Sequence, residues 1–425
     1  MEESSRPNYK KPGREQGSPA AVLVLSLSGI KVLDITHQIA GPWSTELLAD
    51  LGAEVTKVEN PTSGGDPARK YPYFGSAVFV SENRGKQSIT LNLKSEKGRE
   101  VALKLAASSD VLVENFTPGL LEKLGLGYEA LRKLNPRLIY CSISGFGKDS
   151  PYRDRPAWDA ALQAMAGIMT ITGEPDRPPV RVGTSIVDLT AGTYAVCGIL
   201  VALLERERTG EGRFVDISLF DSASSVVNYW ASYASMTGRV PSRMGNTWPA
   251  LAPYQVFRTV DGYAFIGASN DDFFRKLCTS LKLDELGSDP RFATNEARVR
   301  NMKELATLIE EATIHWDNES LVSELARVGV PCAPVNTVDK ILEDQSLRQR
   351  GLVVDTEYGA DDKQKKQIFR TTTNPLRTMF GREEKKSPGE EVEHVPSLGQ
   401  DTERVLLGLG YSELEIKEFR ARGVI

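Results

Sequence analysis

Apolar runs with the length of buried strands alternate with helical patterns from residue 30 to residue 143, and this alternation leaves few possible folds. The strand candidates are Ile30–Ile35, Glu54–Val58, Val111–Glu114 and Leu138–Ile143. The helical patterns lie between them, at Pro42–Leu51, Glu96–Ala107, Gly119–Lys123 and Tyr128–Leu134. Strands and helices in this order form a mostly parallel sheet with helices on its faces. We therefore predict an α/β fold with a Rossmann-like parallel sheet.

A long apolar helix and one more strand extend this pattern to about residue 225. The helix covers Val187–Leu204, with Asp188 at one end. It is shorter and richer in small residues than a membrane span, which favours a buried helix. The alternating segment Phe214–Phe220 predicts a strand. We assign residues 27–225 to the first part of a large domain.

The composition changes after residue 226, where aromatic residues become frequent. Residues 254–267 alternate as in a hairpin, with the turn at Val260–Gly262. Helical patterns follow at Asp271–Leu281 and Met302–Thr313. We predict a disordered N-terminal tail, a smaller α+β domain and a C-terminal segment, over residues 1–26, 226–334 and 335–425.

The charged residues and the cysteines exclude several kinds of partner. Lys and Arg number 52 and Asp and Glu 57, so the net charge of −5 is too mild and too mixed for a nucleic-acid-binding protein. Four widely spaced cysteines and three histidines form none of the motifs that bind metals. We expect no nucleic-acid partner, no disulfide framework and no metal site.

The N-terminal region gives little support for membrane insertion or import. The apolar run Ala20–Leu27 is too short to cross a membrane. Glu2, Glu3 and Glu15 fit poorly with a transit peptide, which is poor in acidic residues. We expect a soluble intracellular protein with no membrane partner, and the cytoplasm and the mitochondrial matrix both remain open.

Segments rich in glycine, proline and polar residues follow the predicted strands. They are Thr36–Pro42, Asn60–Arg69, Glu114–Gly119 and Ser144–Gly147. Ligands of open parallel sheets bind at this edge, beyond the carboxyl ends of the strands. The nearest dinucleotide fingerprint, Gly125–Ala130, follows a helix where that motif requires a strand, and the sequence has no phosphate loop of the ATPase type. A classical dinucleotide site and an ATP-driven reaction therefore have no support in the sequence.

Asp159 opens a helical stretch of mostly small residues. An aspartate at this place usually caps its helix by accepting backbone N–H bonds. A carboxylate can also act as a covalent nucleophile. The residues alone leave both roles open, and the cap is the more common one.

Ordered motifs run from Leu27 to the C-terminus of the chain. They are Gly29–Asp34, Ala40–Pro42, Leu51–Glu59, Gly65–Arg69, Asn83–Ser88, Val113–Gly119, Asp159, Thr209–Gly212, Gly329–Pro331 and Leu398–Thr402. In this order the chain resembles the family III CoA-transferases, the type that includes the formyl-CoA:oxalate and L-carnitine CoA-transferases. The segments Pro253–Tyr263 and Gly267–Asn270 look closest to the succinyl-CoA:glutarate CoA-transferases.

The resemblance implies transfer of CoA from an acyl-CoA, expected to be succinyl-CoA, to a free acid such as glutarate or a similar dicarboxylate. It assigns the attack to Asp159, whose carboxylate needs no general base at neutral pH. An aspartyl–acyl anhydride and then an aspartyl-CoA thioester are the implied intermediates. CoA and acyl-CoA are substrates, and no permanently bound cofactor is expected.

The resemblance also implies a set of CoA contacts: His37, Ala40, Asn83, Arg84, Lys86, Asn115, Phe116 and Lys123. The charges of Arg84 and Lys86 suit phosphates, and Phe116 can pack against the adenine or the pantetheine arm. From the residues alone, surface salt bridges and a core phenylalanine are the more common roles.

Further residues are weaker candidates for substrate contacts. Backbone N–H groups near Gly145, Gly147 and Gly245 are candidates to stabilise a tetrahedral oxyanion. The mobile glycine flap of the formyl-CoA:oxalate enzymes is replaced here by Met244–Pro249. Arg69 can pair with the distal carboxylate of a dicarboxylic acid, or form an internal ion pair with Asp66 or Glu59.

Two positions depart from the formyl-CoA:oxalate pattern. Asn60 stands where that type has an arginine stacked on adenine, and Ile39 where a glutamine faces the active site. The resemblance therefore implies a different adenine contact and a different acid substrate.

Two other functions remain possible at this stage. An α-methylacyl-CoA racemase of the same fold needs a His with an Asp as its acid–base pair. Here Trp158 stands at the histidine position, and no histidine lies between His37 and His315. A non-catalytic acyl-CoA-binding protein would leave Asp159 as a helix cap only.

The resemblance finally implies an interlocked homodimer in which each chain threads through the other. The segment 335–425 would then return to the large domain. The charged stretch Arg382–Glu393 is predicted to be a solvent loop. The expected partners are acyl-CoA, small carboxylic acids and a second copy of the chain.

Overall fold

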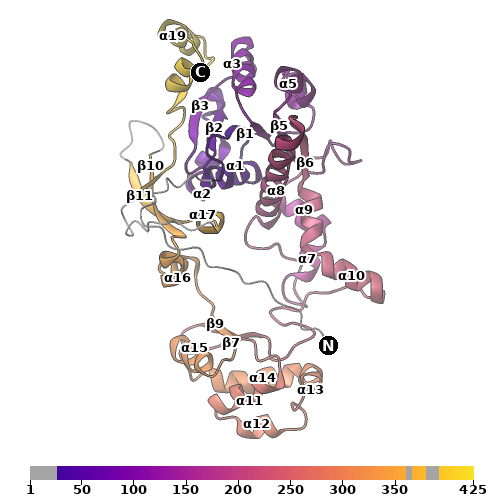
Figure 1. Ribbon diagram of the computed structural model, residues 1–425. Helices are drawn as coiled ribbons and strands as arrows, with labels where there is room; N and C mark the ends of the chain where they lie inside the picture. The colour runs from indigo at the N-terminus through magenta and orange to yellow at the C-terminus, as the bar shows by residue number, and fades with distance from the viewer. Residues whose placement is uncertain (1–25, 360–365, 380–391) are drawn as a thin grey trace, which may run out of the picture.

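A computed structural model describes residues 26–359, 366–379 and 392–425 (Figure 1). The predicted N-terminal tail lies outside the described residues except for Ser26, and the predicted charged loop lies outside them except for its last two residues. The limits assigned to the domains stay predictions.

A six-stranded parallel sheet forms the centre of the large domain. Its strand order is β3-β2-β1-β4-β5-β6. The strands are β1 (Lys31–Ile35), β2 (Glu54–Glu59), β3 (Gln87–Thr90), β4 (Val111–Glu114), β5 (Ile139–Ser144) and β6 (Phe214–Ser218). The predicted α/β fold with a parallel sheet is confirmed. The prediction did not include β3, and it extended β6 into residues that begin a helix.

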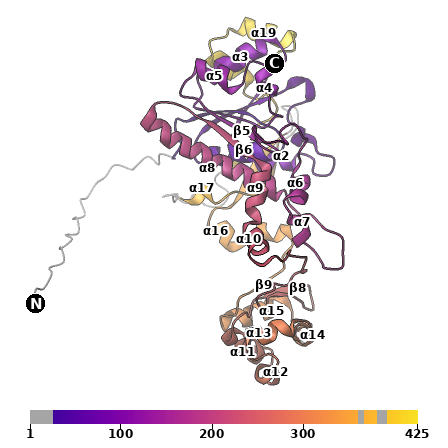
Figure 2. The ribbon, with the colours of Figure 1, turned by 90° about the vertical axis from the view of Figure 1, so that its right-hand side faces the viewer.

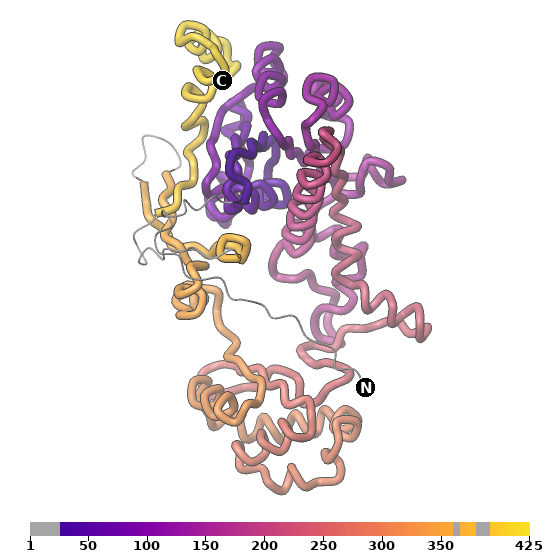
Figure 3. The backbone as a smooth tube through the Cα atoms, viewed as in Figure 1, coloured from indigo at the N-terminus to yellow at the C-terminus, as the bar shows by residue number. Residues whose placement is uncertain are grey.

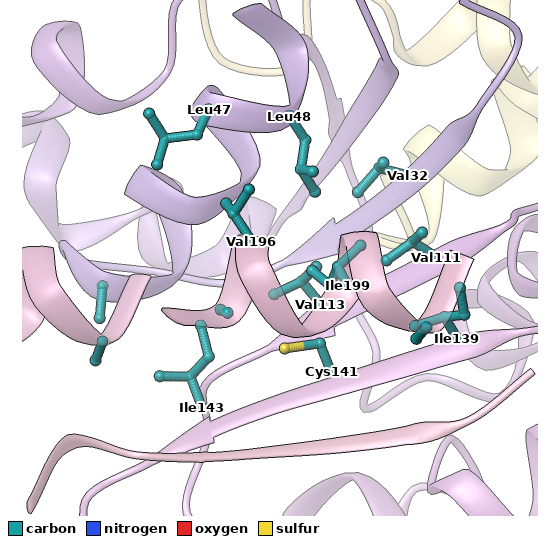
Figure 4. Close-up of a cluster of buried hydrophobic side chains, with 14 of the residues drawn as sticks. Val32, Leu47, Leu48, Val111, Val113, Ile139, Cys141, Ile143, Val196 and Ile199 are labelled. Atoms are coloured by element: carbon teal, nitrogen blue, oxygen red, sulfur yellow. The ribbon is translucent and has the colours of Figure 1, made fainter. Parts of the chain in front are cut away.

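Helices cover both faces of the sheet, as Figure 2 shows. Successive residues of a strand point to opposite faces, so Val32 packs in the core under α1 and α8, whereas Leu33 packs in the core on the other face. Figure 4 shows the first core, where side chains of the sheet meet Leu47, Leu48, Val196 and Ile199. The helices of this domain are α1 (Ala40–Asp50), α2 (Ala77–Glu82), α3 (Glu96–Ala107), α4 (Leu120–Lys123), α5 (Tyr128–Leu134), α6 (Asp159–Met165), α7 (Ile168–Ile171), α8 (Ile186–Thr209), α9 (Leu219–Val226) and α10 (Asn228–Thr237).

Helix α8 is long and apolar enough to cross a membrane by length and composition. It packs instead on α1, β5 and β6 as a core helix. Gly192 permits this packing, because a Cβ there would lie 2.6 Å from the carbonyl oxygen of Ala40 on α1. The close contact places the first turn of α8 near the start of α1, at the carboxyl edge of the sheet.

A smaller domain follows, drawn in orange in Figure 1. Its sheet has the order β7-β8-β9, and β7 and β8 form the predicted antiparallel hairpin. The strands are β7 (Gln255–Arg258), β8 (Tyr263–Ile266) and β9 (Cys332–Pro334). The helices that share its core are α11 (Asp271–Ser280), α12 (Asp284–Ser288), α13 (Asn295–Arg300), α14 (Met302–Thr313) and α15 (Asn318–Arg327).

The tube in Figure 3 shows the chain leaving the large domain after α10 and coming back beyond the small domain. The last helix packs through Ile416 and Phe419 into the same core as Leu33. The elements of this segment are α16 (Gln345–Gln349), β10 (Val353–Tyr358), β11 (Gln367–Thr372), α17 (Leu376–Met379), β12 (Val392–His394), α18 (Thr402–Gly408) and α19 (Glu413–Ala421). Three short 3-10 helices cover Pro61–Ser63, Pro67–Lys70 and Val338–Leu342.

Candidate active site

Asp159 binds the N-terminus of helix α8 rather than capping its own helix. Its Oδ2 accepts hydrogen bonds from the backbone N–H of Val187 at 2.8 Å and of Asp188 at 3.3 Å. Its Oδ1 accepts one from Nε2 of Gln163 at 2.5 Å. The side chain is buried, with a residue exposure of 9%. A negative charge at this place is stabilised by the helix dipole as well as by the bonds.

Asp188 is a second carboxyl group at the same helix terminus, in the first turn of α8. Among the described residues its side chain has no hydrogen-bond partner, and it is partly exposed. Burial, and next the negative charge of Asp159, raise the pKa of Asp188 to about 7. The structure thus places one bonded and one unbonded carboxyl group side by side.

Asp188 was not among the site residues predicted from the sequence, where it stands only as an acidic residue at one end of the long helix. One feature of the sequence could have indicated a site at Asp188. An acidic residue stands at the start of a helix that is rich in small residues, and such a helix lets other elements pack close to its N-terminus. Asp188 lies 29 positions after Asp159 in the sequence. Only the fold brings the two groups together.

The raised pKa of Asp188 predicts an unusual dependence of stability on pH. The folded protein keeps this proton up to about pH 7, whereas the unfolded chain releases it near 3.8. The free energy of unfolding should therefore fall as pH rises from about 4 to about 7, by the contribution of this group. The negative charge of Asp159 acts on Asp188. The charge of Asp188 in turn helps to raise the pKa of Glu82 and of Tyr71. Urea unfolding at several pH values should show a flatter dependence in Asp188→Asn than in the wild type.

Three of the predicted CoA contacts lie together at the ends of β1 and β4. Asn115 accepts a hydrogen bond from the backbone N–H of His37 at 3.0 Å and donates one to its carbonyl oxygen at 2.7 Å. The rings of His37 and Phe116 lie 5.0 Å apart between centroids. Burial is the first cause that lowers the pKa of His37, so the ring is held in its neutral form near neutral pH. Lys123 on α4 is exposed, and Ala40 is buried at the start of α1.

The other three predicted CoA contacts lie inside the protein. Arg84 is 1% exposed and pairs with Glu46 and, at 3.0 Å, with Asp50. The Nζ atom of Lys86 lies 3.0 Å from Asp34 and 2.9 Å from the side-chain oxygen of Asn83. These side chains are used in internal ion pairs and hydrogen bonds, and they present no charge to a phosphate. Their role in this structure is to hold α1, β1 and the loop before β3 together.

Arg69 is likewise not available to a substrate carboxylate. Its guanidinium binds both oxygens of Glu59, at 2.7 and 2.8 Å, and lies over the ring of Phe79. The side chain is buried. Of the two roles that the sequence left open, the structure shows the internal ion pair.

Two of the three predicted oxyanion donors are also used within the protein. The N–H of Gly147 donates to Oγ of Ser144 at 3.0 Å, and that of Gly245 donates to the carbonyl oxygen of Gly173 at 3.0 Å. Gly145 lies at the end of β5, where a Cβ would be 2.3 Å from the Cβ of Ala157. The glycine at this position is explained by close packing against the segment that leads to Asp159.

The candidate site therefore consists of two carboxyl groups at a helix N-terminus and, at the carboxyl edge of the sheet, the two loops joined by His37 and Asn115. Among the described residues no group of three or more His, Cys, Asp or Glu could hold a metal ion. An unbonded, partly exposed carboxyl group of raised pKa is suited to attack an activated carbonyl.

Comparison with known proteins gives the family. The pattern of CoA-transferase family III matches residues 27–402. The chain is 40% identical over 340 residues to a succinate–glutarate CoA-transferase of Agrobacterium fabrum, covering 78% of this chain and 85% of that protein. It is 44% identical over 329 residues to an acetyl-CoA:oxalate CoA-transferase of Acetobacter aceti, covering 77% and 85%. A crystal structure of a CAIB/BAIF family protein from Brucella suis superposes with a TM-score of 0.79 at 40% identity, covering 90% of this chain and 99% of that one.

The chain belongs to CoA-transferase family III, and it is an enzyme of the CoA-transferase type.

The contrast between Lys123 and Arg84 can be tested. Lys123→Ala should weaken binding of an acyl-CoA about ten-fold, as for the loss of one charged hydrogen bond of roughly 1.5 kcal/mol, and leave the melting temperature unchanged. Arg84→Met should lower the free energy of unfolding by about 3–5 kcal/mol, because it leaves Glu46 buried without its partner, whereas Asp50 keeps Arg377 and Asn374. Calorimetric titration with acyl-CoA and urea unfolding measure the two effects. Unfolding of Arg84→Met with wild-type stability would contradict the internal role.

Proposed function

We propose that this enzyme transfers CoA from succinyl-CoA to glutarate or a similar dicarboxylic acid, and that Asp188 is the attacking carboxylate. The assignment rests on the difference in hydrogen bonding between the two aspartates. Asp159 accepts three hydrogen bonds with its two oxygens, whereas the carboxyl group of Asp188 accepts none from the described residues. A nucleophile needs a free lone pair directed at the substrate.

In the proposed reaction an ionised oxygen of Asp188 forms a bond to the thioester carbonyl of the donor. The C–S bond breaks, which gives an aspartyl–acyl anhydride and CoA thiolate. The thiolate then attacks the aspartyl carbonyl and displaces the donor acid, which leaves Asp188 as a CoA thioester. The acceptor acid repeats these steps in reverse and leaves as the new acyl-CoA. No proton or electron is gained or lost over the whole exchange.

The sequence-based prediction that Asp159 makes this attack has not been tested. Its bonding favours a different role, since its two oxygens already accept three hydrogen bonds, which stabilise the carboxylate and make it a weaker nucleophile. We propose that Asp159 holds the start of α8 and keeps a fixed negative charge beside Asp188. That charge makes the ionised Asp188 more basic, and a more basic carboxylate is a better nucleophile.

The choice of dicarboxylic acids rests on the relatives. The Agrobacterium enzyme is named for succinate and glutarate, and the Acetobacter enzyme for oxalate. All three acids carry two carboxyl groups. The acceptor should therefore be a dicarboxylate, with glutarate as the first choice.

We also propose that the enzyme is a dimer of two copies of this chain. Large apolar side chains are exposed along α8 and α10, and they are Tyr194, Val201, Leu204, Tyr229, Tyr233 and Met236. Exposed apolar side chains of this size support burial against another subunit. The interlocked homodimer implied by the resemblance would cover it.

The substrates can be tested by incubating the wild-type enzyme with succinyl-CoA and a panel of monocarboxylic and dicarboxylic acids. Mass spectrometry of the acyl-CoA products identifies the acceptor. Formation of glutaryl-CoA, with little product from monocarboxylic acids, is the expected result. Preferred transfer to a monocarboxylic acid would contradict the proposed substrate class.

A further inference from the structure

Two side chains one turn apart on α6 hold the segment that leads into α8. Asp159 binds the N–H groups of Val187 and Asp188. Gln163 binds Asp159 through its Nε2 atom, and its Oε1 accepts the backbone N–H of Val182 at 2.8 Å. The chain is therefore fixed to α6 at residue 182 and again at residues 187 and 188. We call these two side chains and their bonds the α6 clamp.

The hydrogen bonds of the α6 clamp can form with only one orientation of the Gln163 amide. Rotation of the Gln163 amide by half a turn would point its oxygen at the carboxylate of Asp159 and its NH2 group at the N–H of Val182. Both contacts would then be repulsive. The oxygens of Asp159 face three donors. Gln163 has no exposed surface, so water cannot replace either bond.

Of the four residues between the two points of attachment, only Ile186 packs against the hydrophobic core. Gly183 and Thr184 are exposed. A Cβ built at Gly183 would meet no atom within 4 Å. The α6 clamp therefore adds polar contacts to the packing of α8 on α1, and together they set the direction in which α8 starts and the position of Asp188.

We propose that Gln163 is a positioning residue for the transfer reaction, because its bridge from Asp159 to Val182 holds the first turn of α8 where Asp188 meets the thioester. This inference rests on the proposed function of Asp188. It concerns a residue that touches no substrate in the proposed mechanism. Its loss should therefore change the rate of the chemical step more than substrate binding.

The first variant removes the bridge with little change in volume. Gln163→Met should lower kcat about 10- to 100-fold, as is usual when a reacting group shifts by about 1 Å. The KM for succinyl-CoA should change less than three-fold. The matched control is Gln349→Met, on the exposed face of α16, which should leave both constants unchanged.

The second variant tests the bonds themselves. In Gln163→Glu the introduced carboxyl group can make both bonds only while protonated, donating to Asp159 and accepting from Val182. When it ionises, two carboxylates face each other and the clamp opens. The ratio of the kcat of this variant to that of the wild type should therefore be near one at low pH and fall at least ten-fold as pH rises. Asp159 on the same helix and Asp188 on α8 are the acidic groups near it.

Thermal unfolding and succinyl-CoA binding, measured for both variants, separate a shift in position from a loss of fold. A lower kcat with retained binding, together with the pH-dependent ratio in Gln163→Glu, is the expected result. Wild-type kcat in Gln163→Met would overturn the inference. A Gln163→Glu enzyme that is folded and equally impaired at every pH would overturn it as well. Absence of transfer by the wild-type enzyme would instead count against the proposed function.

Discussion

Asp188→Asn is expected to abolish CoA transfer, with a loss of more than about a thousand-fold in kcat. Removal of an attacking side chain from a serine protease costs on the order of a million-fold, and the carboxamide of asparagine cannot form the anhydride. The substitution preserves the size of the side chain, so binding of succinyl-CoA and the fold should be retained. Transfer is measured by mass spectrometry of the acyl-CoA products.

The control for Asp188→Asn is Asp284→Asn. Asp284 is also an acidic residue in the first turn of a helix, but it is exposed on α12 in the small domain. This variant should transfer CoA at the wild-type rate. Retention of more than a tenth of the wild-type activity in Asp188→Asn would exclude Asp188 as the nucleophile.

Asp159→Asn is expected to impair the enzyme differently. The neutral side chain can still accept from the N–H groups of Val187 and Asp188, but its NH2 group meets the NH2 group of Gln163. Loss of a charged, buried hydrogen bond should lower the free energy of unfolding by about 1.5–3 kcal/mol. The kcat should fall about 10- to 100-fold through displacement of α8, and measurable transfer should remain.

The pH profile gives a second readout for Asp159→Asn. The negative charge of Asp159 is the second cause of the raised pKa of Asp188, after burial. Without it the pKa of Asp188 should move down from about 7, and activity should persist to lower pH than in the wild type. Asp159→Asn without any transfer, beside an active Asp188→Asn, would reverse the two roles.

The sequence predicted most of the large domain because strand and helix periods are local signals. The helix Glu96–Ala107 and the strand Val111–Glu114 have the predicted bounds. Strand β3 was missed because Gln87–Thr90 contains three polar residues among four. The predicted end of β6 was wrong because Ser218 accepts the N–H of Asp221 and so starts α9.

The roles of the charged residues could not be predicted in the same way. Arg84 and Lys86 stand in a loop that looks solvated, and their partners Glu46, Asp50 and Asp34 come from distant segments. The roles of the glycine N–H groups could not be predicted from the sequence either. The N–H of Gly245, a candidate oxyanion donor, is bonded to a carbonyl oxygen of the protein. His37, Asn115 and Phe116 were brought together as expected, because they follow β1 and β4, which are neighbours in the parallel sheet.

The most direct test identifies the aspartate that carries CoA. The wild-type enzyme is mixed with succinyl-CoA in the absence of acceptor, treated with hydroxylamine, digested and analysed by tandem mass spectrometry. We predict a hydroxamate on Asp188 and none on Asp159, because hydroxylamine cleaves an aspartyl thioester or anhydride at the acylated residue. A hydroxamate on Asp159 would contradict the assignment of the nucleophile. Bound succinyl-CoA with no modified aspartate would contradict covalent transfer altogether and favour a racemase or a binding protein.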